Sequence, residues 1–193
     1  DYYPDILHAH DWQAALSVVY LNRYYRTLPD FANIKTVFTI HNIEYQGKYD
    51  HFILGDVFAL GEEHRSLMDY NGCINLMKAA IECADTVSTV SPRYAEEIKT
   101  AEYAHGLQYC LCENAHKLRG ILNGIDYNYY NPEGDPVLLA SFTPSRMAGK
   151  KKDKLAMQKE VGLPEREDVP LLAIISRLAS HKGLDIVTEC IWN

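Results

Sequence analysis

Strand-like and helix-like segments alternate along the first part of this chain. Four short runs rich in apolar and β-branched residues are expected to form strands, at residues 6–10, 35–40, 86–90 and 118–122. Helical patterns begin at Asp11, near Ile74 and at Ser91-Pro92, where Asp and Ser are favoured helix caps and Pro is a favoured first residue. This alternation is typical of an α/β fold built on a mainly parallel sheet.

The carboxy-terminal part of the sequence starts a second set of elements. Residues 128–149 contain several prolines and are expected to be irregular. A helix is expected at residues 150–161, a buried strand at residues 170–176 and a further helix from about Lys182. We therefore expect one domain at residues 1–127, a connection at residues 128–149 and the beginning of a second domain at residues 150–193.

Composition and charge narrow the class of protein. Of the 193 residues, 47% are hydrophobic and 23% are charged, which excludes a mainly disordered chain. The net charge of −7 argues against a general binder of nucleic acid or of anionic membranes. The sequence shows no signal peptide and no apolar run long enough to span a bilayer. Its five cysteines have no metal or disulfide spacing, so we expect reduced thiols and a cytoplasmic location.

Polar residues follow the expected strands at their carboxyl ends, where parallel sheets bind ligands. These residues are His10, His41, Ser91 and Asn123. His41 could donate a hydrogen bond to a sugar hydroxyl or act as an acid or base, but it could also simply bond to the backbone. Asn123-Gly124 could contact a ligand or form a plain turn. Ser91 is better explained as a helix cap than as a nucleophile, because no nucleophile elbow surrounds it.

Two cations flank the end of the expected strand at residues 170–176. Arg177 follows this strand, and Lys182 opens the next helix together with Gly183. Two permanent positive charges beside a helix start suit a diphosphate and could neutralise the charge that grows on it during bond cleavage. The alternative is a pair of surface cations bonded to Asp185 or Glu189.

The segment His8-Ala9-His10-Asp11 raises the question of a metal site. We expect His8 and His10 to point to opposite faces of their strand, and no partner carboxylate stands at a recognisable offset. The sequence therefore predicts no metal site.

Read together, these segments resemble the bacterial glycogen synthase (starch synthase) family of ADP-glucose-using enzymes, glycosyltransferase family 5. The most specific stretches are His-Asn-Ile-Glu-Tyr-Gln-Gly and Leu-Asn-Gly-Ile-Asp, in this order. The matching segments are residues 5–12, 37–47, 76–79, 84–85, 89–92, 94–98, 120–126, 175–178 and 182–185. The resemblance implies the GT-B architecture, with the carboxy-terminal part of a first Rossmann-like domain followed by the start of a second.

The resemblance also implies an activity and roles for individual residues. The activity is a retaining transfer of glucose from ADP-glucose to an α-1,4-glucan, without a metal or a further cofactor. His41 matches the histidine beside the donor glucose, and Asn123 matches the asparagine that contacts the donor-sugar hydroxyls. Arg177 and Lys182 match the pair that binds the diphosphate. By this comparison His41, Arg177 and Lys182 are the expected catalytic residues, and Asn123 joins them in substrate binding.

The resemblance is to a central piece of the family's sequence. The family's amino-terminal Lys-x-Gly-Gly-Leu loop and its carboxy-terminal glutamate motif are missing, so we expect the isolated chain to be inactive. Two alternatives stay open: another GT-B transferase with a different nucleotide-sugar donor, and a glucan-binding module without catalysis. The sequence gives no oligomeric state.

Overall fold

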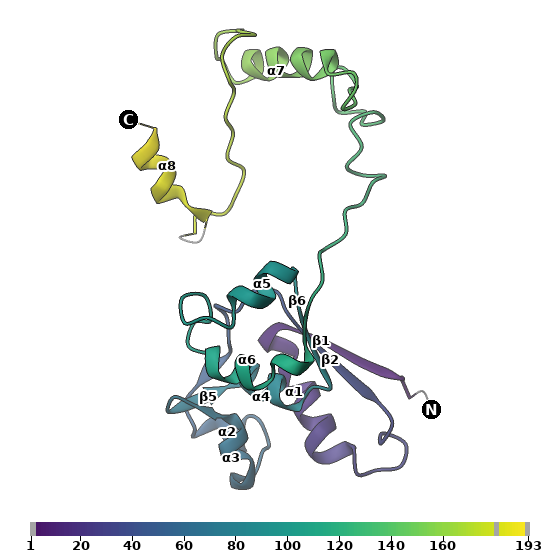
Figure 1. Ribbon diagram of the computed structural model, residues 1–193, viewed down its shortest axis with the longest axis vertical. Helices are drawn as coiled ribbons and strands as arrows, with labels where there is room; N and C mark the ends of the chain where they lie inside the picture. Colours follow the sequence, from purple (N-terminus) through teal and green to yellow (C-terminus); the bar gives the residue numbers. More distant parts are fainter. Residues whose placement is uncertain (1–2, 180–181, 192–193) are drawn as a thin grey trace. The chain divides into compact units, whose positions relative to one another are not determined.

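The computed structural model describes residues 3–179 and 182–191 (Figure 1). The chain divides into two compact units, Asp1–Gly124 and Ile125–Asn193. The strands are β1 (Ile6–His10), β2 (Lys35–Ile40), β3 (Lys48–Tyr49), β4 (Asp69–Tyr70), β5 (Cys73–Asn75), β6 (Thr86–Thr89) and β7 (Leu118–Gly120). The α-helices are α1 (Asp11–Tyr20), α2 (Ile53–Asp56), α3 (Arg65–Met68), α4 (Leu76–Cys83), α5 (Pro92–Glu97), α6 (Gln108–Glu113), α7 (Ala148–Glu160) and α8 (Leu184–Cys190). Short turns of other helix types are η1 (Leu21–Tyr25), η2 (Glu62–His64) and η3 (Ala115–Lys117).

A four-stranded parallel sheet organises the first unit. The strand order is β1-β2-β6-β7, and each neighbouring pair is parallel. In this register His10 lies opposite Thr39, and Ile40 lies opposite Thr89. The expected α/β fold with parallel strands is therefore confirmed. Because the strands are parallel, their carboxyl ends all lie at one edge of the sheet.

Helices packed on this sheet enclose the hydrophobic core of the first unit. Helix α1 contacts β1, β2 and α4, and α5 contacts β6 and β7. The start of α4 is fixed by the buried Asn75, whose side chain accepts a hydrogen bond from the backbone nitrogen of Lys78 at 3.0 Å. The largest fully buried side chains are Phe38, Ile40, Ile43, Leu54, Leu60, Met68, Ile74, Met77, Ile81, Ile98, Leu107 and Leu111.

A small antiparallel sheet, with the order β3-β5-β4, forms a separate layer within the first unit. The sequence predicts a helix from about Ile74. In the structure Ile74 belongs to strand β5, and α4 follows β5 directly. The helix itself begins two residues later, at Leu76, because Asn75 is its cap.

Strand β7 is shorter than the sequence predicts. It ends at Gly120, although the backbone nitrogen of Ile121 still donates to the carbonyl of Thr89 at 2.8 Å. Ile121 and Leu122 are exposed. An apolar strand is stable where other residues bury its side chains. The side chains after Gly120 are exposed, so the strand ends there.

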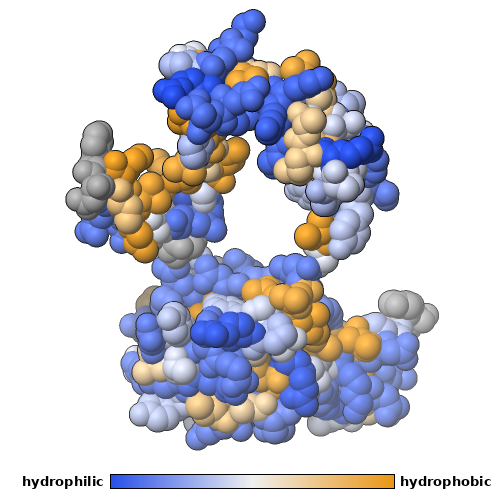
Figure 2. Space-filling model, turned by 45° about the horizontal axis from the view of Figure 1, so that its top comes forward, coloured by the Kyte–Doolittle hydropathy of each residue, from blue (hydrophilic) through white to orange (hydrophobic). Residues whose placement is uncertain are grey.

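The second unit contains α7 and α8, and α7 agrees with the helix expected at residues 150–161 to within two residues. The strand expected at residues 170–176 is wrong: the described part of this unit has no strand there. Ile175 is 99% exposed, and Figure 2 shows hydrophobic side chains crowding the surface of the C-terminal stretch. A strand needs a hydrogen-bonding neighbour and an apolar cover, and residues 125–179 and 182–191 offer neither to this segment.

Candidate functional site

The expected site residues of the first unit all lie near the carboxyl ends of the strands of the parallel sheet. Strand β1 ends at His10, His41 follows β2 directly, and Ser91 stands two residues after β6. Asn123 stands three residues after β7 and is exposed. The structure therefore places these residues at the edge where parallel sheets bind ligands. Their roles stay predictions.

Asp11 holds the backbone on which His41 stands. Its carboxylate oxygen Oδ1 accepts hydrogen bonds from the backbone nitrogens of His41, at 2.8 Å, and Asn42, at 3.4 Å. Asp11 was expected to cap α1, but it is the first residue of this helix and His10 takes the cap position without a side-chain bond. The reason is its backbone: a φ of 54° places Asp11 in the left-handed region, and its carboxylate bonds to the loop after β2 instead of to its own helix.

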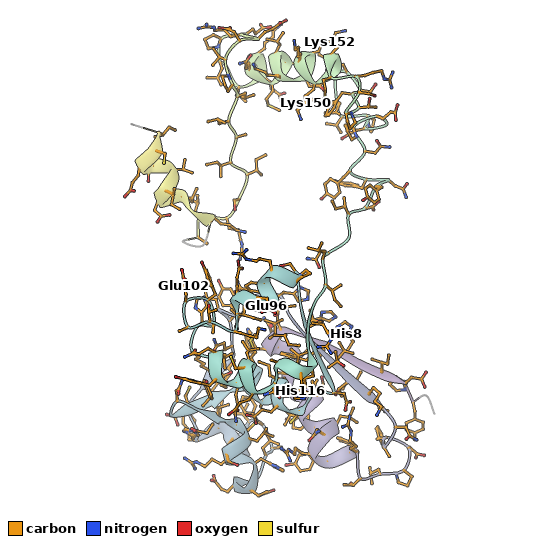
Figure 3. The ribbon with its side chains drawn as sticks, viewed as in Figure 1. His8, Glu96, Glu102, His116, Lys150 and Lys152 are labelled. Atoms are coloured by element: carbon orange, nitrogen blue, oxygen red, sulfur yellow. The ribbon has the colours of Figure 1, made fainter. Side chains whose placement is uncertain are left out.

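His8, His10 and His41 form a cluster of three imidazole rings. Figure 3 labels His8 on the sheet of the first unit. The ring centroids of His8 and His10 are 4.2 Å apart, and those of His10 and His41 are 5.2 Å apart. The expectation that His8 and His10 point to opposite faces is wrong. Side chains two residues apart in a strand point to the same face, because the pleat has a period of two.

His8 is tied into the interior of the sheet. Its Nε2 lies 2.7 Å from the hydroxyl of Thr39, which in turn lies 2.7 Å from the hydroxyl of the buried Ser88. Burial lowers the pKa of His8, and the nearby His10 and His41 lower it further. The lowered pKa favours the neutral form of the His8 ring.

The loop after His41 is anchored on several sides. Asn42 accepts a bond from the backbone nitrogen of Glu44 at 2.9 Å, which makes a local turn. The buried Gln46 donates to the carbonyls of Ile43 and His105. Gly47 has a φ of +66°, and an added Cβ would lie 2.8 Å from the ring of Trp12. Glycine is therefore required where this loop crosses α1.

Ser91 acts as the helix cap that the sequence predicts. Its hydroxyl accepts a hydrogen bond from the backbone nitrogen of Tyr94 at 2.9 Å, and Pro92 is the first residue of α5. The hydroxyl is thus engaged in helix capping and is not presented as a nucleophile.

Arg177 and Lys182 both lie in the second unit and are exposed. The backbone nitrogen of Ala179 donates to the carbonyl of Arg177 at 2.9 Å, and that of Lys182 donates to the carbonyl of Ala179 at 3.0 Å. These two turns lead to Gly183, which has a φ of 69° and precedes α8. Ser180 and His181 lie outside the described residues. The structure keeps the two cations in one turn region, and their diphosphate role stays a prediction.

The sequence analysis did not predict the contacts that two residues make at the edge of the sheet. One is Asp11, read only as a cap, and the other is His10 as a ring partner of His41. The signal for His10 was present, because the spacing of His8 and His10 places them on one face of β1. The signal for Asp11 was not local, because its partners are 30 and 31 residues away along the chain.

Among residues 3–179 and 182–191, no three His, Cys, Asp or Glu side chains are grouped so that they could hold a metal ion. In the same part of the chain, no helix has the length and apolar character needed to cross a lipid bilayer.

Comparison with known proteins identifies the family. The family model for the starch synthase catalytic domain matches residues 1–113. The chain belongs to this family. The resemblance found in the motifs is therefore confirmed, with the match extending over strands β1, β2 and β6 of the parallel sheet and ending with α6, before β7.

Individual relatives agree with this membership. The glycogen synthase of Streptococcus mutans is 46% identical over 188 residues, which cover 96% of this chain and 40% of the relative. The glycogen synthase of Streptococcus agalactiae is 47% identical over 191 residues, which cover 98% of this chain and 40% of the relative. The chain thus spans about two fifths of the length of these curated glycogen synthases.

A solved structure supports the fold. The catalytic domain of starch synthase IV from Arabidopsis thaliana, bound to ADP and acarbose, matches with a TM-score of 0.84 and 36% identity. The match covers 98% of this chain and 39% of that one. Together with the parallel sheet, this likeness confirms the expected GT-B class for the part of the starch synthase fold that the chain contains.

Proposed function

We propose that this chain is the central part of a retaining glucosyltransferase that transfers glucose from ADP-glucose to an α-1,4-glucan. The observation that carries the proposal is the match to the starch synthase catalytic domain over residues 1–113, together with His41 and Asn123 at the carboxyl edge of its sheet. The Arabidopsis relative that binds ADP and acarbose supports both halves of the proposal, a nucleotide donor and a glucan acceptor.

The proposed reaction breaks one bond and forms another at the same carbon. The bond between glucose C1 and the β-phosphate oxygen of ADP-glucose breaks, and C1 bonds to the 4-hydroxyl oxygen at the non-reducing end of the glucan. The proton of that hydroxyl passes to the departing phosphate. Negative charge grows on the departing ADP. Arg177 and Lys182 carry permanent positive charge and would stabilise this leaving group, while His41 and Asn123 would bind the hydroxyls of the donor glucose.

The proposal assigns no metal, no nucleic acid and no membrane to this reaction. We also place the protein in the cytoplasm, since its five cysteines, Cys73, Cys83, Cys110, Cys112 and Cys190, are free thiols. The isolated chain is expected to lack synthase activity, because it spans about two fifths of its relatives and the reaction would need residues from the rest.

A chimera tests this function. The matching segment of the Streptococcus mutans glycogen synthase is replaced with this chain, and incorporation of labelled glucose from ADP-glucose into glycogen is measured beside the isolated chain. We expect elongation by the chimera and none by the isolated chain. Arg177→Ala and Lys182→Ala should each lower kcat by about 100-fold or more, since each removes a charge that stabilises the leaving group.

The matched control is Lys152→Ala, which removes an exposed lysine of α7 (labelled in Figure 3) and should leave the rate unchanged. A chimera with full activity after loss of Arg177 or Lys182 would contradict the proposed roles. Binding of maltooligosaccharides by the isolated chain, with no transfer by the chimera, would instead favour a glucan-binding module. Transfer from a different nucleotide sugar would favour another GT-B enzyme.

A further inference from the structure

The three-histidine cluster contains a direct contact between two imidazole nitrogens. His10 Nδ1 lies 2.9 Å from His41 Nε2, and the two rings are inclined by 29°. Two nitrogens at this distance share one hydrogen, since two bare nitrogens or two N–H groups would repel. Either His10 donates from Nδ1 or His41 donates from Nε2. In both arrangements, Nε2 of His41 is occupied, and Nδ1 is the ring nitrogen left for a ligand.

The surroundings hold both partners of this pair in place. The ring of His10 lies against the ring of His8, which is fixed through Thr39 to Ser88 inside the sheet. The backbone of His41 is fixed by the carboxylate of Asp11. The pair therefore links the last residue of β1 to the residue that follows β2, at the edge where the ligand is expected. Rotation of the His41 ring would break its bond to His10.

We propose that His10 is the positioning residue for His41: it occupies Nε2 of His41 and thereby presents Nδ1 of the same ring to a ligand hydroxyl group. The assignment of that hydroxyl to the donor sugar rests on the proposed function. The pairing of the two rings does not, because it follows from geometry within the first unit alone.

The pair can be measured directly on the 193-residue chain. In a uniformly ¹⁵N-labelled sample near pH 8, an N–H···N hydrogen bond gives a scalar coupling between the two nitrogens. We expect a resolved coupling between His10 Nδ1 and His41 Nε2. Its absence in the folded chain under these conditions would overturn the proposal. This measurement needs no variant and no ligand.

Two variants separate positioning from a general structural role. His10→Ala removes the partner nitrogen, and the His41 Nε2 resonance should then move toward that of the exposed His116. His10→Asn keeps an amide group near the former Nδ1 position and should restore most of the wild-type resonance. His116→Ala, which removes an exposed ring labelled in Figure 3, is the matched control and should leave the His41 signals unchanged.

Unchanged His41 ring resonances in a folded His10→Ala chain would contradict the proposal, and so would a failure of Asn to restore them. A failure of the histidine pair can be told apart from a failure of the proposed function. A chimera that transfers no glucose would contradict the function while the coupling still demonstrates the pair. An absent coupling would overturn the pair whatever the chimera does.

Discussion

At the scale of single residues, burial separates side chains of the same type. Cys110 and Cys112 both lie on α6, two positions apart, but Cys110 is buried and Cys112 is exposed. Burial raises the pKa of the Cys110 thiol to about 12. Since the thiolate is the reactive form, two neighbouring cysteines should differ strongly in reactivity.

Alkylation with iodoacetamide at pH 8 tests this difference. At this pH about one Cys110 thiol in ten thousand is ionised in the folded chain, and burial also blocks access. We expect Cys112 to be modified within minutes and Cys110 to be protected until urea unfolds the chain, as read by peptide mass spectrometry. Equal rates at the two cysteines in the native chain would contradict the burial of Cys110.

A partly exposed network of hydrogen bonds and an ion pair at Asp85 gives a second residue-scale prediction. Burial alone would raise the pKa of this carboxyl, but hydrogen bonds from Arg26 and from the backbone and hydroxyl of Thr36 outweigh burial and lower the pKa. A carboxyl with a lower pKa in the folded state stabilises the fold above its unfolded pKa of about 3.9. This contribution is lost as the pH falls through the folded pKa.

The free energy of unfolding in urea should therefore decrease from pH 5 toward pH 2.5, and Asp85→Asn should reduce this dependence. At pH 7 the same substitution should cost about 1–2 kcal/mol, because the carboxylate is partly exposed and the amide keeps one acceptor oxygen. Asp30→Asn removes the same charge at an exposed position and serves as the control. A pH profile identical in the Asp85→Asn and wild-type chains would contradict the network's role.

At the scale of elements, the packing of β7 on the start of α5 depends on the absence of a side chain. A Cβ added at Gly120 would overlap the carbonyl of Ser91 and the backbone of Pro92. These are backbone atoms and cannot rotate away. The close approach fixes β7 against the helix that Ser91 caps.

Gly120→Ala should therefore lower the free energy of unfolding by about 1–3 kcal/mol, the usual range for overpacking. The measurement is the midpoint of urea unfolding, monitored by circular dichroism. Gly124→Ala is the matched control, since nothing lies within 4 Å of a Cβ added there. Equal midpoints for the two variants would show that β7 and α5 can separate without cost.

At the scale of the whole molecule, the two units differ in how much of their helices they bury. Seven of the eight residues of α4 in the first unit are buried. The 13 residues of α7 in the second unit bury only Gln158. A helix of this length with only one buried residue is marginal in water, because helix stability in proteins comes mainly from the buried face.

Hydrogen–deuterium exchange read by mass spectrometry should follow this contrast. We expect the amides of α7 to exchange within seconds and those of α4 to exchange only on global opening of the first unit. Protection of α7 equal to that of α4 would contradict the contrast and would show that α7 is covered in solution.

Sequence alone determined the elements whose signals are local. The strands β1 and β2, the cap at Ser91, the helix near residue 150 and the family motifs were all predicted correctly, because periodicity and capping depend on neighbouring residues. Only the tertiary structure decided what depends on distant partners. The bond between His10 and His41 joins residues 31 positions apart through the β1–β2 register, and the carboxylate of Asp11 accepts hydrogen bonds from the loop that follows β2. Residues 170–176 have a strand-like pattern, but the described part of their unit contains no strand beside them. A segment forms a strand only when a neighbouring strand bonds to it, so its own sequence does not decide the outcome.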